Sequence, residues 1–157
     1  MFRNGLIEGV VFKTLDRYCD ARGWLIELFR EDEMAAADRP RMSYVSETLP
    51  GVARGPHEHV EQSDYFAFTG PGDFKLYLWD ARTASPTCRC RHVASVGESN
   101  RQAVLIPPGV VHAYKNVSDR PGWVINCPNR LYRGEAKREA VDEIRHEDVE
   151  DSPYVLD

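Results

Sequence analysis

Two histidines lie two positions apart in the segment GVARGPHEHVEQSD, which covers residues 51–64. Successive side chains of a β-strand point to opposite faces, so His57 and His59 would project from one face of a strand. Asp64 follows five residues later, and His112 lies in the distant segment PPGVVHAYKN. Gly109 permits a tight turn into the strand that carries His112. Two antiparallel strands of one barrel would then bring His112 opposite the histidine pair.

These four residues allow three interpretations. Three imidazoles and one carboxylate suit a divalent transition metal, with open positions for water or substrate. A histidine, with an ordinary pKa of about 6.5, also suits proton transfer near neutral pH. The third interpretation is that the histidines only form hydrogen bonds inside a barrel.

The elements that would position these residues are short strands. Apolar or alternating runs of about four to eight residues, rich in Val, Ile and aromatic residues, recur between Gly and Pro, as in an all-β sandwich or barrel. We expect one domain over residues 1–157, with a tight turn in TGPGD (69–73). The charged tail, about 134–157, is predicted to hold a helical segment at 134–145 and to be otherwise solvated. The predicted strand runs are 9–15, 23–29, 41–47, 64–70, 73–79, 91–96, 102–108, 111–117 and 122–127.

Composition excludes several classes of protein. The formal charge of −5 argues against a broad nucleic-acid surface, although a local basic pocket for a small anion stays possible. No apolar run approaches the roughly 20 residues that span a bilayer, and the N-terminal segment lacks the layout of a signal peptide. We therefore expect a cytoplasmic protein. The four cysteines show neither a zinc-site spacing nor, in an intracellular protein, a reason to form a disulfide framework.

Two segments resemble the motifs of the cupin superfamily. The first has the form G-x5-H-x-H-x4-E-x6-G, with Asp64 in the Glu position and the last Gly one residue early. The second has the form P-x-G-x2-H-x3-N, which Pro107, Gly109, His112 and Asn116 all match. The resemblance implies an all-β cupin-type jelly roll (a double-stranded β-helix), followed here by a short helical or loop segment.

Four further segments resemble the dTDP-4-dehydrorhamnose 3,5-epimerase family, from about residue 8 to about residue 135. They are DARGWLIELF (20–29), GVARGPH (51–57), WDARTASPT (79–87) and IPPGVVHAY (106–114). The D-x-R-x-x-S-P-T pattern is the most diagnostic, because metal-binding cupins have no reason to carry it. The resemblance implies a homodimer that exchanges N-terminal strands and isomerises a nucleotide-linked 4-keto-6-deoxy sugar without a cofactor.

The family removes a proton next to the C4 ketone of the sugar and returns a proton to the opposite face. Such chemistry needs a base, an acid across the ring and positive charge near the enolate oxygen. The resemblance places His57 on the family's base and Tyr132 on its opposing acid.

The resemblance also assigns the residues that hold the substrate. Arg54 falls on the arginine that contacts the diphosphate and sugar, and a guanidinium fork suits such an anion. Arg22 and Glu27 fall on nucleotide-binding residues donated by the partner subunit. His112 falls on a pocket histidine, and we also assign His59 to substrate binding. In contrast, Asp80 and Arg82 fall on residues that hold the fold together.

The pocket departs from the family pattern. Asp64 replaces the family's lysine, so a carboxylate stands where an enolate needs a cation. Glu58 and His59 replace Tyr-Gln, and the aspartate that orients the base is Asp142 or Asp148.

Three explanations of these departures remain open. The protein is an epimerase or ketoisomerase in which His59 or another cation replaces the lysine. Alternatively, the pocket binds a metal that supplies the positive charge and acts on a small molecule, or the protein binds sugars without catalysis. The ligands of that metal would be His57, His59, Asp64 and His112.

Overall fold

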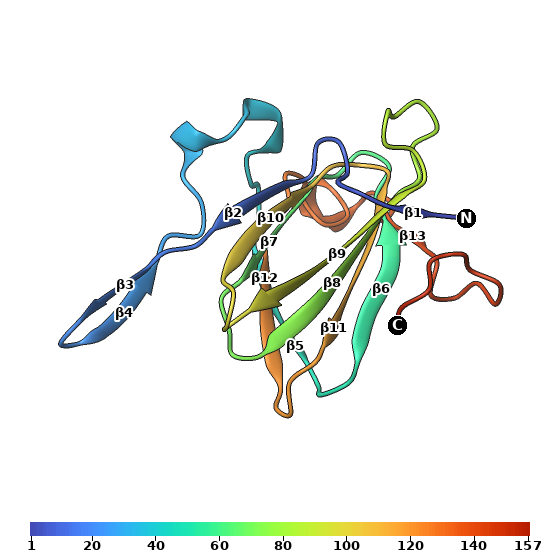
Figure 1. The fold of residues 1–157 in the computed structure, drawn as a ribbon. Helices are drawn as coiled ribbons and strands as arrows, with labels where there is room; N and C mark the ends of the chain where they lie inside the picture. The colour runs from blue at the N-terminus through green and yellow to red at the C-terminus, as the bar shows by residue number, and fades with distance from the viewer.

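Two facing β-sheets make up the body of the protein in a computed structural model that describes residues 1–157 (Figure 1). Six strands form one sheet in the order β1-β9-β8-β11-β6-β13, and five form the other in the order β2-β10-β7-β12-β5. A separate hairpin pairs β3 with β4. This architecture confirms the predicted all-β jelly roll. The strands are β1 (Arg3–Asn4), β2 (Val11–Thr14), β3 (Arg17–Asp20), β4 (Gly23–Ile26), β5 (Tyr44–Thr48), β6 (Ala53–Glu58), β7 (Asp64–Phe68), β8 (Asp73–Asp80), β9 (Cys90–Gly97), β10 (Gln102–Ile106), β11 (Val110–Asn116), β12 (Gly122–Asn126) and β13 (Ile144–Arg145).

The predicted helix at 134–145 is wrong. That segment contains only a 3-10 turn, Glu135–Lys137, and the two-residue strand β13. Ala136 and Lys137 have φ values of 52° and 59°, in the left-handed region that a continuous α-helix excludes. Two further 3-10 turns, Glu31–Glu33 and Ala36–Asp38, follow β4. None of the helices is long and apolar enough to cross a membrane.

The main core lies between the two sheets, and strand alternation builds it. Phe74, Leu76 and Leu78 of β8 join this core, whereas Tyr77 and Trp79 belong to a cluster on the outer face of the same sheet. Residues i and i+2 of a strand share a face, so alternate residues of one strand pack into the core between the sheets and into the cluster on the outer face. By the same rule, inward-facing positions on β6, β7 and β11 meet inside the sandwich.

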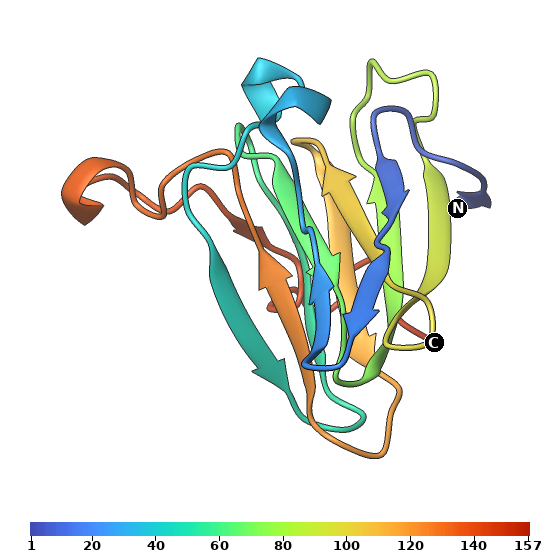
Figure 2. The same cartoon turned by 90° about the vertical axis from the view of Figure 1, so that its left-hand side faces the viewer.

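The outer faces are covered by the chain ends and by the segment around the hairpin. Phe2, Tyr154 and Leu156 pack on the outer cluster of the six-stranded sheet. Leu15, just before the hairpin, and Ile26, at the end of β4, pack on the outer face of the five-stranded sheet. Figure 2 shows the hairpin in front of the sandwich, and the segment after β12 leaving it as a loop with a helical turn.

The D-x-R-x-x-S-P-T segment forms a buried polar network after β8. Both carboxylate oxygens of Asp80 accept hydrogen bonds from the Arg82 guanidinium, at 2.8 and 2.9 Å. The hydroxyl groups of Ser85 and Thr87 donate to the same carboxylate, each at 2.6 Å. Arg82 also donates to the backbone oxygen of Glu8, at 2.7 Å. These contacts tie the 81–89 loop to the N-terminal segment, in agreement with the structural role expected for Asp80 and Arg82.

Candidate functional site

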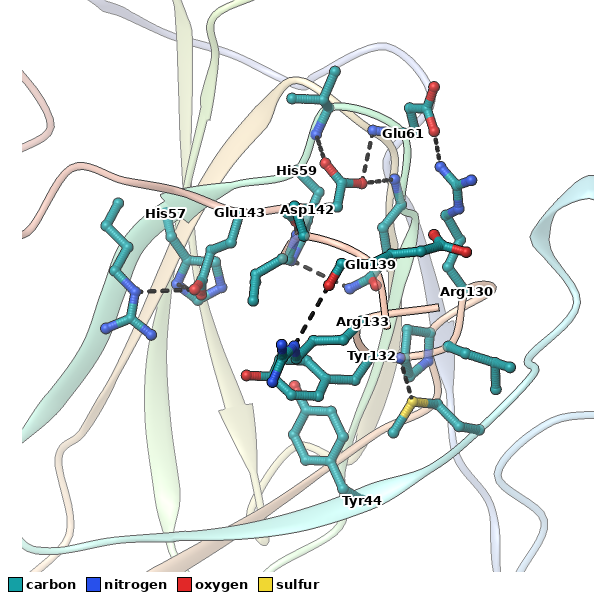
Figure 3. A pocket seen from close by; sticks show the side chains of 18 of the residues that line it. Tyr44, His57, His59, Glu61, Arg130, Tyr132, Arg133, Glu139, Asp142 and Glu143 are labelled. Carbon is teal, nitrogen blue, oxygen red and sulfur yellow. Dashed lines mark hydrogen bonds and ion pairs between the residues drawn. The ribbon is translucent and has the colours of Figure 1, made fainter. Parts of the chain in front are cut away.

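A pocket of about 1240 Å³ lies between strands β5 and β6 and the segment that follows β12 (Figure 3). More than half of its lining residues fall between Pro128 and Glu147. Part of the charged tail therefore forms a wall of the pocket, while most of its charged side chains are exposed to solvent, as expected. Small-molecule sites usually measure about 300–1,000 Å³, so this pocket has room for a large ligand.

Three imidazole rings and one carboxylate meet at the inner end of the pocket. His57 on β6 lies directly opposite His112 on β11, and their ring centroids are 4.4 Å apart. Oδ2 of Asp64, from the opposite sheet, lies 3.0 Å from Nε2 of His59 and 3.1 Å from Nε2 of His112. We call these four residues the histidine cluster: His57, His59, Asp64 and His112.

Gly55 permits the close approach of β6 and β11, the strands that carry His57 and His112. Its φ is +81°, and a Cβ atom at this position would lie 2.5 Å from the backbone oxygen of His112. Any side chain there would force β6 away from β11 and separate His57 from His112. Gly55 in the segment GVARGPH is therefore needed to keep His57 close to His112.

The outer ring nitrogens of two histidines bond to backbone carbonyl groups. Nδ1 of His112 lies 3.0 Å from the oxygen of Val110, and Nδ1 of His59 bonds to the oxygen of Asp142. A carbonyl oxygen only accepts, so both Nδ1 atoms carry a hydrogen. The contacts between the Nε2 atoms and Asp64 are short but not aligned as hydrogen bonds. Oδ2 of Asp64 and Nε2 of His112 are consequently buried without a hydrogen-bond partner.

Asp64 is fixed through its other oxygen. Oδ1 accepts hydrogen bonds from Gln62 Nε2 and Asn126 Nδ2, both at 2.9 Å. Asn126 also donates to the hydroxyl oxygen of Tyr44, at 3.0 Å, so that oxygen is linked to the histidine cluster. Burial raises the pKa of Tyr44 to about 12, which keeps this phenol protonated.

Burial and the interactions among the cluster side chains shift the pKa values of His57, His59 and Asp64 in different directions. Burial lowers the pKa of His57 to about 2, with His112 and His59 adding to the shift, so His57 is neutral. Burial acts to lower the pKa of His59 as well, but the adjacent negative charge of Asp64 outweighs it and raises that pKa to about 9. Burial acts to raise the pKa of Asp64, and His112 and His59 outweigh it, so this pKa lies well below its usual value.

Glu143, which immediately precedes β13, is the carboxylate beside His57. Its Oε1 lies 3.9 Å from Nδ1 of His57, and its Oε2 accepts a hydrogen bond from Arg145 at 2.9 Å. β13 pairs with β6 and places Arg145 opposite His57, which holds Glu143 at this position. Asp142 instead accepts hydrogen bonds from three successive backbone N–H groups, at residues 60–62.

Three basic side chains of the pocket have no carboxylate partner. Arg54 donates to Thr48 and to the backbone oxygen of Glu47, while the other two are Arg133 and Lys137. The remaining pocket arginines are paired, Arg130 with Glu61 and Arg145 with Glu143. Unpaired guanidinium and ammonium groups in a recess favour an anionic ligand.

Comparison with known proteins now decides the family. Residues 5–149 match the family described as dTDP-4-dehydrorhamnose 3,5-epimerase. The chain belongs to this family. Membership in the dTDP-4-dehydrorhamnose 3,5-epimerase family makes the protein an enzyme of the nucleotide-sugar epimerase class, as its motifs indicated.

Two curated relatives of the epimerase family align over most of their length. A probable low-salt glycan biosynthesis epimerase of Haloferax volcanii is 38% identical over 127 residues, which cover 80% of this chain and 81% of that protein. The spore coat polysaccharide biosynthesis protein SpsL of Bacillus subtilis is 35% identical over 127 residues, which cover 81% and 83%.

Solved structures of the family share the fold. A dTDP sugar isomerase from Desulfovibrio desulfuricans superimposes with a TM-score of 0.81 at 24% identity, covering 95% of this chain and 91% of that one. A 4-keto-6-deoxy sugar epimerase from Streptomyces spheroides gives a TM-score of 0.71 at 25% identity, covering 84% and 72%.

The structure brings some of the residues predicted from the epimerase pattern together and leaves others apart. His57, His59, Arg54 and Tyr132 line the pocket, whereas His112 is only 1% exposed and lies beneath its wall. Arg22 and Glu27 are not among the lining residues. Arg22 lies at the hairpin tip, and Glu27 immediately follows β4.

Sequence reasoning missed Glu143, Tyr44, Arg133 and Lys137. Asp142 and Asp148 were the expected carboxylates, because the family uses aspartate at this position. The tail contains many acidic residues, and no motif fixes its alignment with the family. The pairing of β13 with β6 fixes that register and selects the residue after Asp142. Tyr44 lines the pocket, although no motif assigned it a role.

Proposed function

We propose that this protein epimerises or isomerises a nucleotide-linked 4-keto-6-deoxy sugar by removing and returning a proton at a carbon next to the ketone. The observation that carries the proposal is the placement of His57, in a member of this epimerase family, on a pocket wall with Glu143 behind it. The proton transfer uses protein groups alone.

His57 is the base in this mechanism. Its neutral ring has a lone pair for the proton, and Nδ1 faces the carboxylate of Glu143. The low pKa would make an isolated His57 a weak base. A carboxylate that closes on Nδ1 stabilises the imidazolium as it forms, which strengthens the base at the moment of transfer. The His59 ring, positively charged beside Asp64, supplies positive charge to the pocket in place of the family's lysine.

The acid that returns the proton is Tyr132. In Figure 3 the rings of Tyr132 and Tyr44 point into the pocket from a different side than His57. A base and an acid on different sides of the sugar ring are what inversion of a carbon centre requires. Tyr44 bonds to Asn126, whereas no hydrogen bond engages the hydroxyl group of Tyr132.

The nucleotide diphosphate is bound by the unpaired cations of the pocket, with Arg54 nearest the sugar. We assign Arg22 and Glu27 to the nucleotide end of a neighbouring subunit, within a homodimer that exchanges its hairpins. Tyr18, Trp24 and Leu25 on the hairpin are each more than half exposed, which favours a covered position in an assembly. The four cysteines are free, as suits a cytoplasmic protein.

Incubation with dTDP-4-keto-6-deoxyglucose in heavy water tests this function. We expect NMR to show deuterium at C3, at C5 or at both, together with inversion of at least one of these centres or movement of the ketone. Binding of the nucleotide sugar without deuterium uptake would instead identify a sugar-binding protein. Absence of both binding and uptake for a panel of 4-keto-6-deoxy sugars would contradict the proposal.

A further inference from the structure

The histidine cluster holds two buried polar atoms that the proton-transfer mechanism leaves unsatisfied. Oδ2 of Asp64 and Nε2 of His112 have no hydrogen-bond partner, although both side chains are only 1% exposed. A buried polar atom without a partner costs about 1–3 kcal/mol, so a native protein needs a compensating interaction there.

The ring tautomers show what kind of partner is missing. Nδ1 of His112 donates to the backbone oxygen of Val110, so the lone pair of the neutral ring is on Nε2. That lone pair faces Oδ2 of Asp64, an acceptor, at 3.1 Å. Two acceptors in contact inside a protein repel each other, and either a proton on Nε2 or a metal cation between them relieves the repulsion.

Two of the three rings have the outer bonds that metal-binding histidines have, and the third faces a carboxylate. Such histidines usually donate their second nitrogen to a carbonyl or a carboxylate, which fixes the tautomer and aims the lone pair at the metal. His112 and His59 bond to backbone carbonyl groups, and Nδ1 of His57 faces the carboxylate of Glu143 at 3.9 Å. The Nε2 atoms of His57 and His112 are therefore left for a shared ligand, and that of His59 becomes available when an incoming cation displaces its proton.

The spacing of the four donor atoms approaches that of a metal site. They all lie within 4.8 Å of one another. Two atoms that each lie about 2.1 Å from one ion are at most about 4.2 Å apart, so the widest pair must close by at least about 0.6 Å to complete the set. The contacts between Asp64 and the two Nε2 atoms, at 3.0 and 3.1 Å, already have a suitable separation.

We propose that the histidine cluster is a binding site for one divalent transition-metal ion, of which Zn²⁺ and Co²⁺ are suitable probes. Imidazole and carboxylate donors favour such ions over Mg²⁺ or Ca²⁺, which prefer oxygen. The metal-loaded protein is inactive in proton transfer, because the lone pair that would accept the substrate proton binds the ion. The cluster thus alternates between a catalytic form and a metal-bound form.

Metal binding is measured first, without reference to activity. Protein stripped with a chelator is titrated with Zn²⁺ by calorimetry, and the bound metal is counted after gel filtration. We expect one ion per chain and a higher melting temperature. Asp64→Asn and His59→Asn should each reduce the affinity at least about 10-fold. His146→Asn is the matched control, because His146 pairs with Glu58 outside the cluster and its loss should leave Zn²⁺ binding unchanged.

Failure to bind Zn²⁺ or Co²⁺ would overturn the proposal and leave the epimerase function untouched. Undiminished binding in both cluster variants, with folding verified by circular dichroism, would place the metal elsewhere and would also overturn it. In the second measurement, one equivalent of Zn²⁺ should suppress deuterium uptake into the substrate by about 100-fold, and a chelator should restore it. Undiminished uptake by the loaded protein would refute a role of His57 as ligand.

Discussion

At the scale of single residues, the proposed proton transfer depends on the Glu143 carboxylate beside His57. Glu143→Gln keeps the size of the side chain and removes the charge that stabilises protonated His57. We expect kcat for deuterium exchange to fall by about 10- to 1,000-fold with little change in KM, because the loss acts on the proton transfer and not on binding. Glu143→Asp should recover part of the rate. Glu147→Gln, a change at another glutamate of the pocket wall, is the control. An equal loss in both variants would argue that the pocket only needs negative charge.

Tyr132 has a separable role at the same scale. If His57 removes and returns the proton on one face while Tyr132 delivers it on the other, Tyr132→Phe should still exchange solvent deuterium into the substrate but should lose inversion. NMR of the recovered sugar distinguishes the two configurations. Tyr44→Phe, a change at the neighbouring phenol, should retain inversion. The reverse pattern would transfer the role of acid to Tyr44, whose side chain also lines the pocket.

At the scale of elements, Asp80 stabilises the loop after β8, and its protonation should destabilise the fold. Burial acts to raise its pKa, but the bonds from Arg82, Ser85 and Thr87 lower it far below the usual value. Its stabilisation is therefore present above the unfolded pKa of about 3.8 and is lost as the pH falls below it. We expect Asp80→Asn to reduce the free energy of unfolding by about 3 kcal/mol at pH 7, measured with urea, and by less at pH 3.

The same tripeptide, Asp-Ala-Arg, provides the control for that prediction. Asp20 pairs with Arg22 at the exposed hairpin tip with the same spacing. Asp20→Asn should leave the free energy of unfolding unchanged, because an exposed ion pair contributes little. An equal effect at both sites would show that burial of the Asp80 network does not determine its contribution.

Elements with a strong alternation were predictable from the sequence, whereas those fixed by tertiary pairing were not. The runs at 73–79 and 102–108 have a strand-like apolar pattern within their own sequence, and they correspond to β8 and β10. The predicted turn at 69–73 exists, but it joins strands of opposite sheets, because β7 pairs with β10 and β12. The two-residue strand β13 has no periodicity to detect, so the position of Glu143 could not be predicted. The convergence of Asp64 with His59 and His112 followed from motif spacing, although their hydrogen-bond partners did not.

At the scale of the whole molecule, the hairpin β3–β4 extends from the sandwich (Figure 1) with Trp24 59% exposed. If the hairpin covers a second copy of the chain, Trp24→Arg should convert a dimer into a monomer in light scattering after gel filtration. The KM for the nucleotide sugar should rise with it, because Arg22 and Glu27 would no longer reach the neighbouring pocket. Val117→Arg, at an exposed valine in the loop after β11, is the matched control. An unchanged assembly in Trp24→Arg would contradict the exchanged-hairpin dimer.

The most direct test of the central claim is deuterium uptake from heavy water by His57→Asn compared with the wild-type protein, both stripped of metal. Asparagine cannot accept the proton, so we predict that uptake into the 4-keto sugar falls at least about 100-fold while circular dichroism and nucleotide-sugar binding are retained. Uptake at the wild-type rate in a folded His57→Asn protein would contradict the assignment of His57, because the base would then be another residue.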